Sequence, residues 1–400
     1  MESTNHSPEF TLLLSCCRVN PRQEELDLRA NTLASPIDEN HFIFLVNRHL
    51  VAPLVYFNLK HETEISDNLK SGLKFLAEQN QFKVLVAKQM IIRLQKKFNE
   101  LNVKGLFLKG VPLSEMYYGD VGLRHTMDID VWVEESGFIP VSNYLQSLGY
   151  SSNLDLSTFN KKQIAYKYKT DHHLLFTIDK PQYPSIIELH WKIRGRLGIF
   201  TFNPSERFSE LISYNSSNTL IPVFNHVDNL LFLCTHGCDH AWYRLKWFFD
   251  LPQLINTVDF NWKEVLNRSE QLNCIDQLLL SFLLLNKLLN EPIPSELQLR
   301  LQQHKLSWSL GYVEHCVLYN GFYCDTDKEK LLNLRYVLSQ NKKGIFNPTL
   351  LYRHLTSEND WKLLPLPSDL FFLYFPLRPF LLLWRRMTKN KVQQTLNLKH

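Results

Sequence analysis

The sequence has no marked excess of charge of either sign and no composition typical of a specialised class of protein. Its 44 basic and 40 acidic residues leave a net charge of +4. This is far below the dense positive surface of a dedicated nucleic-acid binder, so we expect no stable nucleic-acid complex. Hydrophobic residues at 44% and charged residues at 21% exclude a wholly disordered or collagen-like chain. A chain of 400 residues with this composition is long enough for two or three domains.

Disulfide and targeting signals are also missing. The seven cysteines are odd in number and scattered along the chain, unlike the framework of a small secreted disulfide protein. The first residues contain neither the basic stretch nor the apolar run of a signal peptide. These absences predict a reducing, cytoplasmic location.

No apolar run is long enough to cross a membrane. The most membrane-like stretch, residues 370–384, is interrupted by Pro376, Arg378 and Pro379, whereas a spanning helix needs roughly 20 apolar residues. Two interpretations of this segment stay open. Packing on the protein's own core is favoured, and peripheral contact with a membrane surface is the lesser alternative.

The pattern of apolar residues changes twice along the chain. Helical spacing predicts helices over residues 41–59, 69–101, 111–118, 137–148, 227–251, 262–289, 296–306 and 308–319. Short apolar runs and alternating patterns predict strands over residues 105–108, 127–133, 171–178 and 185–193. The last two strands are separated by a proline-containing turn, so we expect them to form a hairpin.

Together these elements predict an α+β protein with a small mixed sheet. We expect an N-terminal helical region over residues 1–101, a mixed core over 102–222 and a C-terminal helical domain over 223–400. No repeat of fixed period is visible, which excludes solenoid and propeller architectures.

Two aspartates mark the stretch with the clearest chemistry. Asp128 and Asp130 are at positions i and i+2 of a predicted strand, so both point to one face with their bases about 7 Å apart. Carboxylates this close repel one another unless cations lie between them. A pair of Mg²⁺ ions about 3.5 to 4 Å apart suits that span, and oxygen ligands favour Mg²⁺. The competing interpretation is a solvated strand edge without a metal.

The surroundings favour a phosphate and metal site. Lys109 and Gly110 end the preceding strand, and a short predicted helix begins there, with backbone N–H groups available to an anion. Glu188 lies among apolar neighbours on a later predicted strand. A buried acid needs a partner or a metal, because an isolated buried charge is costly.

Several polar and aromatic residues recur within the predicted helix 227–251. His236, His240, Tyr243, Trp247 and Asp250 are spaced to share one helical face, which predicts a surface lining a site. The nearby cysteines at positions 234 and 238 allow zinc as a weaker alternative, because zinc sites more often use Cys-x-x-Cys turns.

At these positions the sequence resembles an uncharacterised bacterial family of nucleotidyltransferases within the DNA-polymerase-β-like superfamily. The resemblance spans roughly residues 40–290. It is carried by Leu108-Lys109-Gly110, Arg124, Asp128-Ile129-Asp130, Glu188-Leu189-His190-Trp191, His236, His240, Arg244 and Asp250. One departure is Val111, which follows Gly110 where the superfamily usually has glycine or serine, so a serine hydroxyl contact to phosphate is absent.

The resemblance implies an enzyme that moves an NMP group from an NTP to an acceptor and releases pyrophosphate. Asp128, Asp130 and Glu188 would be the catalytic residues and would hold two Mg²⁺ ions. The implied nucleotide contacts are Lys109, Gly110, Arg124, His240 and Arg244. A small molecule, a peptide or protein, or a tRNA end are all open as acceptors. A non-catalytic nucleotide-binding or scaffold protein on the same fold is the alternative function.

Overall fold

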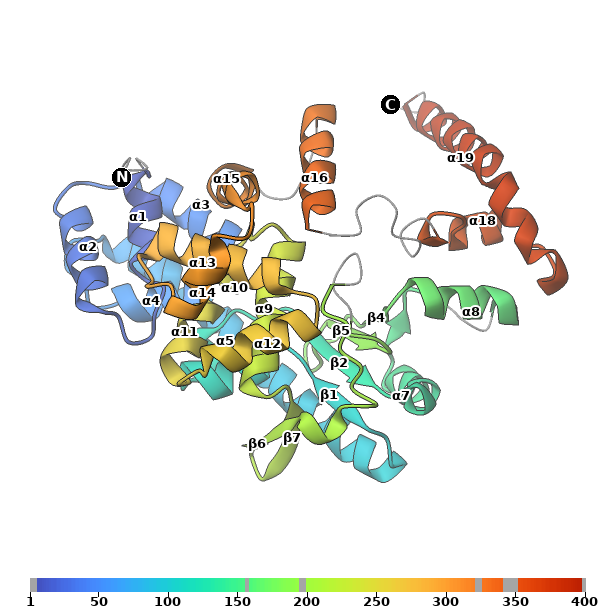
Figure 1. Ribbon diagram of the computed structural model, residues 1–400, viewed down its shortest axis with the longest axis horizontal. Helices are drawn as coiled ribbons and strands as arrows, with labels where there is room; N and C mark the ends of the chain where they lie inside the picture. Colours follow the sequence, from blue (N-terminus) through green and yellow to red (C-terminus); the bar gives the residue numbers. More distant parts are fainter. Residues whose placement is uncertain (1–5, 155–157, 194–198, 321–325, 341–351, 398–400) are drawn as a thin grey trace. The chain divides into compact units, whose positions relative to one another are not determined.

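The computed structural model describes residues 6–154, 158–193, 199–320, 326–340 and 352–397 (Figure 1). Contacts within the chain divide it into two compact units. The first unit contains Met1–Ser152 and His173–Asn341, and the second contains Asn153–His172 and Lys342–His400. The domain boundaries predicted near residues 101 and 222 both lie inside the first unit.

A five-stranded mixed sheet lies in the first unit, with the strand order β1-β2-β5-β4-β3. The strands are β1 (Gly105–Phe107), β2 (Ile129–Val133), β3 (Ser151–Ser152), β4 (His173–Thr177) and β5 (Ile186–His190). Strands β2 and β5 run parallel, and the other neighbouring pairs are antiparallel. The predicted α+β architecture with a small mixed sheet is confirmed, as is the antiparallel pairing of the two strands expected to form a hairpin.

Several short elements connect or extend this sheet. They are α6 (Val111–Leu113), the wider helical turn η1 (Ser114–Tyr118), η2 (Val121–Leu123), α7 (Glu135–Ser147), η5 (Phe208–Glu210), β6 (Ile212–Ser216) and β7 (Thr219–Val223). The hairpin β6–β7 forms a separate two-stranded sheet that the sequence pattern did not predict. Its turn contains Ser217 and Asn218, which both have positive φ angles, as a tight two-residue turn requires.

The N-terminal part of the first unit is helical, as predicted. Its helices are α1 (Pro8–Leu14), α2 (Gln23–Leu33), α3 (Glu39–His49), α4 (Ala52–Leu59) and α5 (Asp67–Leu101). The single helix predicted over 41–59 is wrong, because Leu50 adopts φ 55° and separates α3 from α4. The long helix α5 begins where the Ser66 hydroxyl accepts a hydrogen bond from the amide of Leu69 at 3.0 Å.

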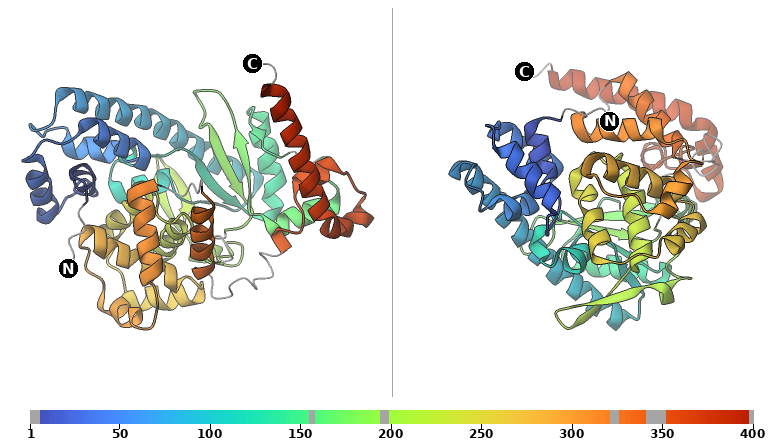
Figure 2. Two further views of the ribbon diagram at one scale, coloured as in Figure 1. Left: turned by 90° about the horizontal axis from the view of Figure 1, so that it is seen from above. Right: turned by 60° about the vertical axis from the view of Figure 1, so that its left-hand side comes forward.

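A second group of helices follows the hairpin β6–β7. It consists of α9 (His226–Asp239), α10 (Leu245–Phe248), α11 (Asp250–Thr257), α12 (Trp262–Gln271), α13 (Ile275–Leu289), α14 (Ser295–Leu301), α15 (Ser307–His315), η6 (Cys316–Asn320) and α16 (Asp327–Ser339). Figures 1 and 2 show these helices, yellow to orange, beside the blue N-terminal helices. Residues of both groups belong to one continuous hydrophobic core.

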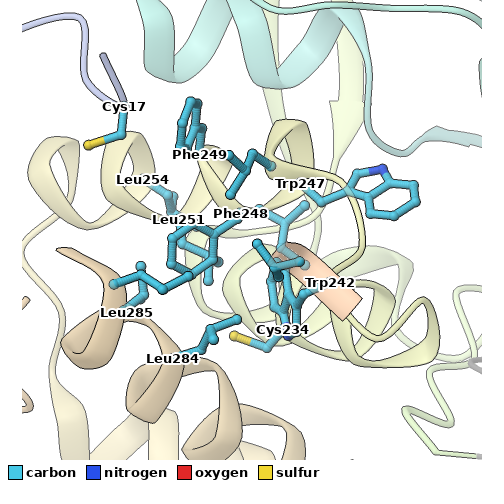
Figure 3. Close-up of a cluster of buried hydrophobic side chains, with 14 of the residues drawn as sticks. Cys17, Cys234, Trp242, Trp247, Phe248, Phe249, Leu251, Leu254, Leu284 and Leu285 are labelled. Atoms are coloured by element: carbon cyan, nitrogen blue, oxygen red, sulfur yellow. The ribbon is translucent and has the colours of Figure 1, made fainter. Parts of the chain in front are cut away.

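The predicted uninterrupted helix over 227–251 is wrong. The chain leaves α9 at His240, and Ala241 and Trp242 adopt φ angles of 46° and 52° before α10 begins. The indole of Trp242 is fully buried within the core, close to Cys234 and Phe248 (Figure 3). Burial of this large side chain therefore outweighs the local preference for a continuous helix. The predicted helix 262–289 is interrupted in a similar way at Asn273, where φ is 55°.

Gly237 makes the return of the chain after α9 possible. A Cβ atom at this position would lie 2.3 Å from the ring of Trp242. We expect Gly237→Ala to lower the free energy of unfolding by about 1–3 kcal/mol, because the added methyl overpacks the core. Urea unfolding monitored by circular dichroism measures the change. Gly311→Ala is the control, since no atom lies within 4 Å of that Cβ position in α15. An unchanged stability in Gly237→Ala would show that the contact relaxes without cost.

The second unit has a small aromatic core of its own. Its elements are α8 (Lys161–Thr170), α18 (Glu358–Leu363), η8 (Ser368–Leu373) and α19 (Tyr374–Asn397). Tyr166, Trp361, Phe371, Tyr374 and Leu381 are buried together in that core. Part of the segment 370–384 thus packs within its own unit. Among the described residues, no helix has the length and apolar character needed to cross a membrane.

Candidate active site

The parallel pairing of β2 with β5 brings two predicted acids together. Asp130 on β2 is in register with Glu188 on β5, so their side chains leave the sheet on the same face. The segment directly after strand β1 adds Lys109 from the other side, because the amide of Leu108 donates a 3.0 Å hydrogen bond to the carbonyl of Asp130. Three segments distant in sequence therefore meet at one position in the sheet.

Lys109 and His190 lie against these acids. The Nζ atom of Lys109 is 3.2 Å from Oδ1 of Asp130. The Nε2 atom of His190 is 3.4 Å from the same oxygen and 3.4 Å from Oε2 of Glu188. Asp130 is only 6% exposed, so these contacts are weakly screened by solvent.

The charges at this position reinforce one another. Burial alone would raise the pKa of Asp130, but Lys109 and then His190 outweigh burial and hold that pKa well below its usual range. Burial would likewise lower the pKa of Lys109, and the carboxylates, first Asp130, raise it instead. The pKa of His190 is also raised, because its contacts with the two acids outweigh its burial. An ionised carboxylate is thus held beside two nitrogen groups that favour their charged forms.

Asp128 has a different electrostatic environment. It directly precedes β2, which begins two residues later than the strand predicted from the sequence. Burial, and then the charge of Asp130, raises the pKa of Asp128, while Lys109 and Lys246 oppose the rise. The Asp128 carboxylate is therefore close to the other acids and short of positive charge, which is the condition that a bound cation relieves.

A polar network fixes the loop that leads to Asp128. The side chain of Asn80 donates to the carbonyls of Gly122 and Arg124 at 3.1 Å each, and it accepts from the amide of Thr126 at 3.1 Å. Since Asn80 lies on the long helix α5 and is 1% exposed, it holds the loop at a fixed distance from that helix.

Arg124 is paired with Asp250. Its Nε and Nη2 atoms donate to the two oxygens of Asp250 at 2.7 and 2.8 Å, and Nη1 contacts the carbonyl of His125. All three guanidinium nitrogens of Arg124 are thus engaged within the protein. Its contact with a nucleotide stays a prediction.

His240 and Arg244 lie in the turn between α9 and α10 and not on one continuous helical face. The His240 ring stacks on Trp247 with centroids 4.7 Å apart and meets the ring of His236 edge-on at 4.7 Å. The guanidinium of Arg244 lies 5.1 Å from the ring centre of Tyr243. His236, in the same aromatic group, is influenced by the charges of the site. Burial and then Lys109 lower its pKa well below the usual value, and Asp130 only partly opposes this shift.

Two site residues received no role from the sequence analysis. His190 follows Glu188 by two positions, so the same i, i+2 rule that paired the aspartates would have placed it with the acids. Lys246 is 9% exposed, and its pKa is lowered to about 8 by burial and then by Arg124. No sequence signal indicated Lys246, because its position depends on the turn at Ala241 and Trp242.

The donor atoms fit a hard divalent cation. One ligand atom from each of Asp130, Glu188 and His190 lies within 4.8 Å of the others. Two carboxylates are the oxygen ligands that Mg²⁺ accepts, and the imidazole of His190 suits Mn²⁺ once the cation displaces its proton. The ligand set expected from the sequence was Asp128, Asp130 and Glu188. The group that converges here has His190 as its third member and does not include Asp128.

The zinc alternative at positions 234 and 238 is not supported. Both thiols are buried, and burial raises the pKa of Cys234 to about 12. Zinc binding requires thiolates, which such burial disfavours. Within the described ranges, neither cysteine belongs to a group of side chains with metal-binding geometry.

Acidic strand residues beside a buried lysine are an arrangement that suits enzymes that transfer phosphorus-containing groups. Comparison with known families agrees with this class. The family described as uncharacterised nucleotidyltransferases matches residues 35–290, and the chain belongs to that family. The protein is therefore a nucleotidyltransferase, that is, a transferase of phosphorus-containing groups.

The chain was also compared with solved structures and with curated proteins. The chain is similar to the lincosamide antibiotic adenylyltransferase LnuA, seen in a lincomycin-bound crystal structure, at 15% identity with a TM-score of 0.29. The similarity covers 42% of this chain and 94% of the LnuA chain. No curated protein matches the chain.

Proposed function

We propose that the protein transfers a nucleoside monophosphate from an NTP to an acceptor and releases pyrophosphate. The observation that carries the proposal is the meeting of Asp130 and Glu188, on neighbouring strands, with Lys109, which follows β1. Asp128 directly precedes β2. Acids and a cation in this arrangement suit a reaction that depends on positioning and on neutralising phosphate charge.

The acids are the proposed metal ligands. Asp128, Asp130 and Glu188 would hold Mg²⁺ ions, with His190 beside them, and bound ions would neutralise the triphosphate and lower the pKa of the acceptor hydroxyl. Glu188 would also accept the proton of that hydroxyl.

The lysines are the proposed phosphate contacts. Lys109 is paired with Asp130, so an incoming triphosphate would draw its ammonium group away from the carboxylate. Lys246 carries no ion pair with any described residue at salt-bridge distance, and it lies near enough to Asp128 to shift that residue's pKa. A buried amine of this kind gains most from an anion, which restores its charged form.

A labelling experiment tests the proposal. The purified full chain is incubated with each of the four NTPs labelled at the α-phosphate, with a cell extract supplied as small molecules, tRNA and protein fractions. We expect label to appear in one fraction with release of pyrophosphate, and EDTA should abolish both. Nucleotide binding without transfer in any fraction would instead support the non-catalytic alternative.

Lys246 gives a separate prediction that couples stability to pH. Its pKa is about 8 in the folded protein and 10.5 in its ordinary state, so the unfolded chain binds more protons between these pH values. The penalty for burying the charge is therefore complete below pH 8 and disappears as the pH rises toward 10.5. We expect Lys246→Met to raise the free energy of unfolding by about 3 kcal/mol at pH 7, with little gain at pH 10.5.

The same substitution should lower transfer by about 100-fold, because a phosphate contact is lost. Guanidinium unfolding at the two pH values and a transfer assay measure the two effects. The control is Lys74→Met, since Lys74 is 58% exposed on α5. A gain in stability that is equal at both pH values would contradict the assignment of the effect to this amine.

A further inference from the structure

The helix α19 in the second unit has two distinct faces. Tyr374 and Leu381 are buried in the aromatic core of that unit. Arg378 and Arg385, which share this face at helical spacing, both pair with the buried carboxylate of Asp360. The inner face of α19 is therefore fixed to its own unit by packing and by charge.

The outer face of α19 is apolar and exposed. Phe380 is 68% exposed and Leu383 is 58% exposed, and with Pro376 they follow the i, i+4, i+7 spacing of one helical stripe. Six of the 20 large hydrophobic side chains that are exposed among the described residues lie within residues 370–384. Such a concentration of exposed apolar side chains indicates an interaction surface.

The charge of the same segment indicates the kind of partner. From residue 370 to residue 400 the sequence contains no aspartate or glutamate and six arginine or lysine residues. Two of these arginines pair with the single carboxylate of Asp360, and four basic residues follow them in sequence, at positions 386, 389, 391 and 399. An apolar helical stripe continued by basic residues without acids is the pattern of a helix that lies at an anionic lipid surface.

We propose that α19 docks the protein on an anionic membrane surface through the stripe containing Phe380 and Leu383. The apolar side chains enter the boundary between headgroups and acyl chains, and the sequence after Arg385 supplies positive charge for the phosphate groups. The inner face stays in the second unit, so docking requires no unfolding of that core. The proposal is independent of the reaction carried out in the first unit.

Vesicle sedimentation with the full chain tests the proposal. We expect binding to vesicles of phosphatidylcholine mixed with phosphatidylglycerol, weak binding to pure phosphatidylcholine, and release by added salt. The double variant Phe380→Ser/Leu383→Ser should lose at least about 10-fold in vesicle partitioning. Lys389→Glu/Lys391→Glu should lose binding to the anionic vesicles. Leu331→Ser is the matched control, since Leu331 is 67% exposed on α16 in the other unit.

Two other occupants of the stripe are outcomes of the same experiment. Concentration-dependent self-association of the full chain that Phe380→Ser/Leu383→Ser abolishes would identify a second copy as the partner. If the parent protein does not bind vesicles and the variant has a lowered melting temperature, the stripe packs within the same chain. Either result, or equal binding of the variant and the parent protein to anionic vesicles, would overturn the proposal.

Discussion

Asp130→Asn is expected to lower nucleotidyl transfer by about 1000-fold. The asparagine side chain would keep the shape of the aspartate but lose the charge that balances Lys109 and that, in the proposed function, binds a cation beside Glu188. Groups that stabilise charge in a buried site commonly contribute factors of this size. Initial rates of pyrophosphate release at saturating NTP and Mg²⁺ measure the effect.

The experiment separates a loss of chemistry from a loss of folding. The control is Glu134→Gln, because Glu134 follows the other end of β2 and accepts a hydrogen bond from the backbone of Lys104. Both variants are assayed at a temperature at which far-ultraviolet circular dichroism shows native helix content. Full activity of Asp130→Asn under these conditions would remove the proposed role of the carboxylates.

The stability of Asp130→Asn should also respond to pH. Because the folded-state pKa of Asp130 is well below its usual value, the carboxylate contributes stability above the unfolded-state pKa and loses it as the pH falls through the folded-state value. The difference in stability between the parent protein and the variant should therefore be present at pH 7 and shrink on acidification. This behaviour checks the ion pair with Lys109 independently of activity.

The parts of the site that the sequence predicted are those with a local signal. The spacing of Asp128 and Asp130 placed both aspartates on one face, and an acid among apolar neighbours identified Glu188. The pairing of β2 with β5, which brings Glu188 beside Asp130, is a long-range feature. Local periodicity does not specify which strands become neighbours.

The errors in the helical regions have one physical cause. The continuous helix over 227–251 was predicted from the spacing of its apolar residues, but Ala241 and Trp242 adopt positive φ angles that interrupt it. Their conformation depends on the burial of Trp242 against Gly237 and the surrounding core. Tertiary packing thus overrides the local preference, and it also places Lys246 and the ring of His240.

The division of the chain into two compact units could not be predicted from local sequence patterns either, because it depends on long-range contacts. Residues 153–172 join the C-terminal part of the chain in one unit, where Tyr166 on α8 packs with Trp361 and Phe371. A division of the sequence into consecutive segments cannot represent a unit made of two separated stretches. The sequence nevertheless identified residues 370–384 as the most membrane-like stretch of the chain. In the structure, part of this stretch forms the exposed apolar stripe of α19.

Asp250→Asn is expected to lower the free energy of unfolding by about 3–5 kcal/mol, because it leaves the buried charge of Arg124 without its partner. The side chain of Asp250 is 1% exposed and that of Arg124 is 4% exposed. Asparagine would still accept the 2.7 Å hydrogen bond from the Tyr118 hydroxyl, so the loss reports mainly on the charge. Guanidinium unfolding measures the effect, and Glu78→Gln, in an exposed pair with Lys74 on α5, should change stability by less than about 0.5 kcal/mol.

The double variant Arg124→Met/Asp250→Asn tests whether the loss of stability in Asp250→Asn comes from the broken ion pair or from disturbed packing at that position. With both charges removed, no uncompensated charge is left buried, so the double variant should lose clearly less stability than the sum of the two single variants. Additive losses would contradict the pairing. Since the same loop leads to Asp128, Asp250→Asn should also reduce transfer in the folded fraction, and the double variant should not restore it. In the double variant, stability would be partly regained because no unpaired charge is buried. Activity would stay low, because the loop has lost the ion pair that joins it to α11.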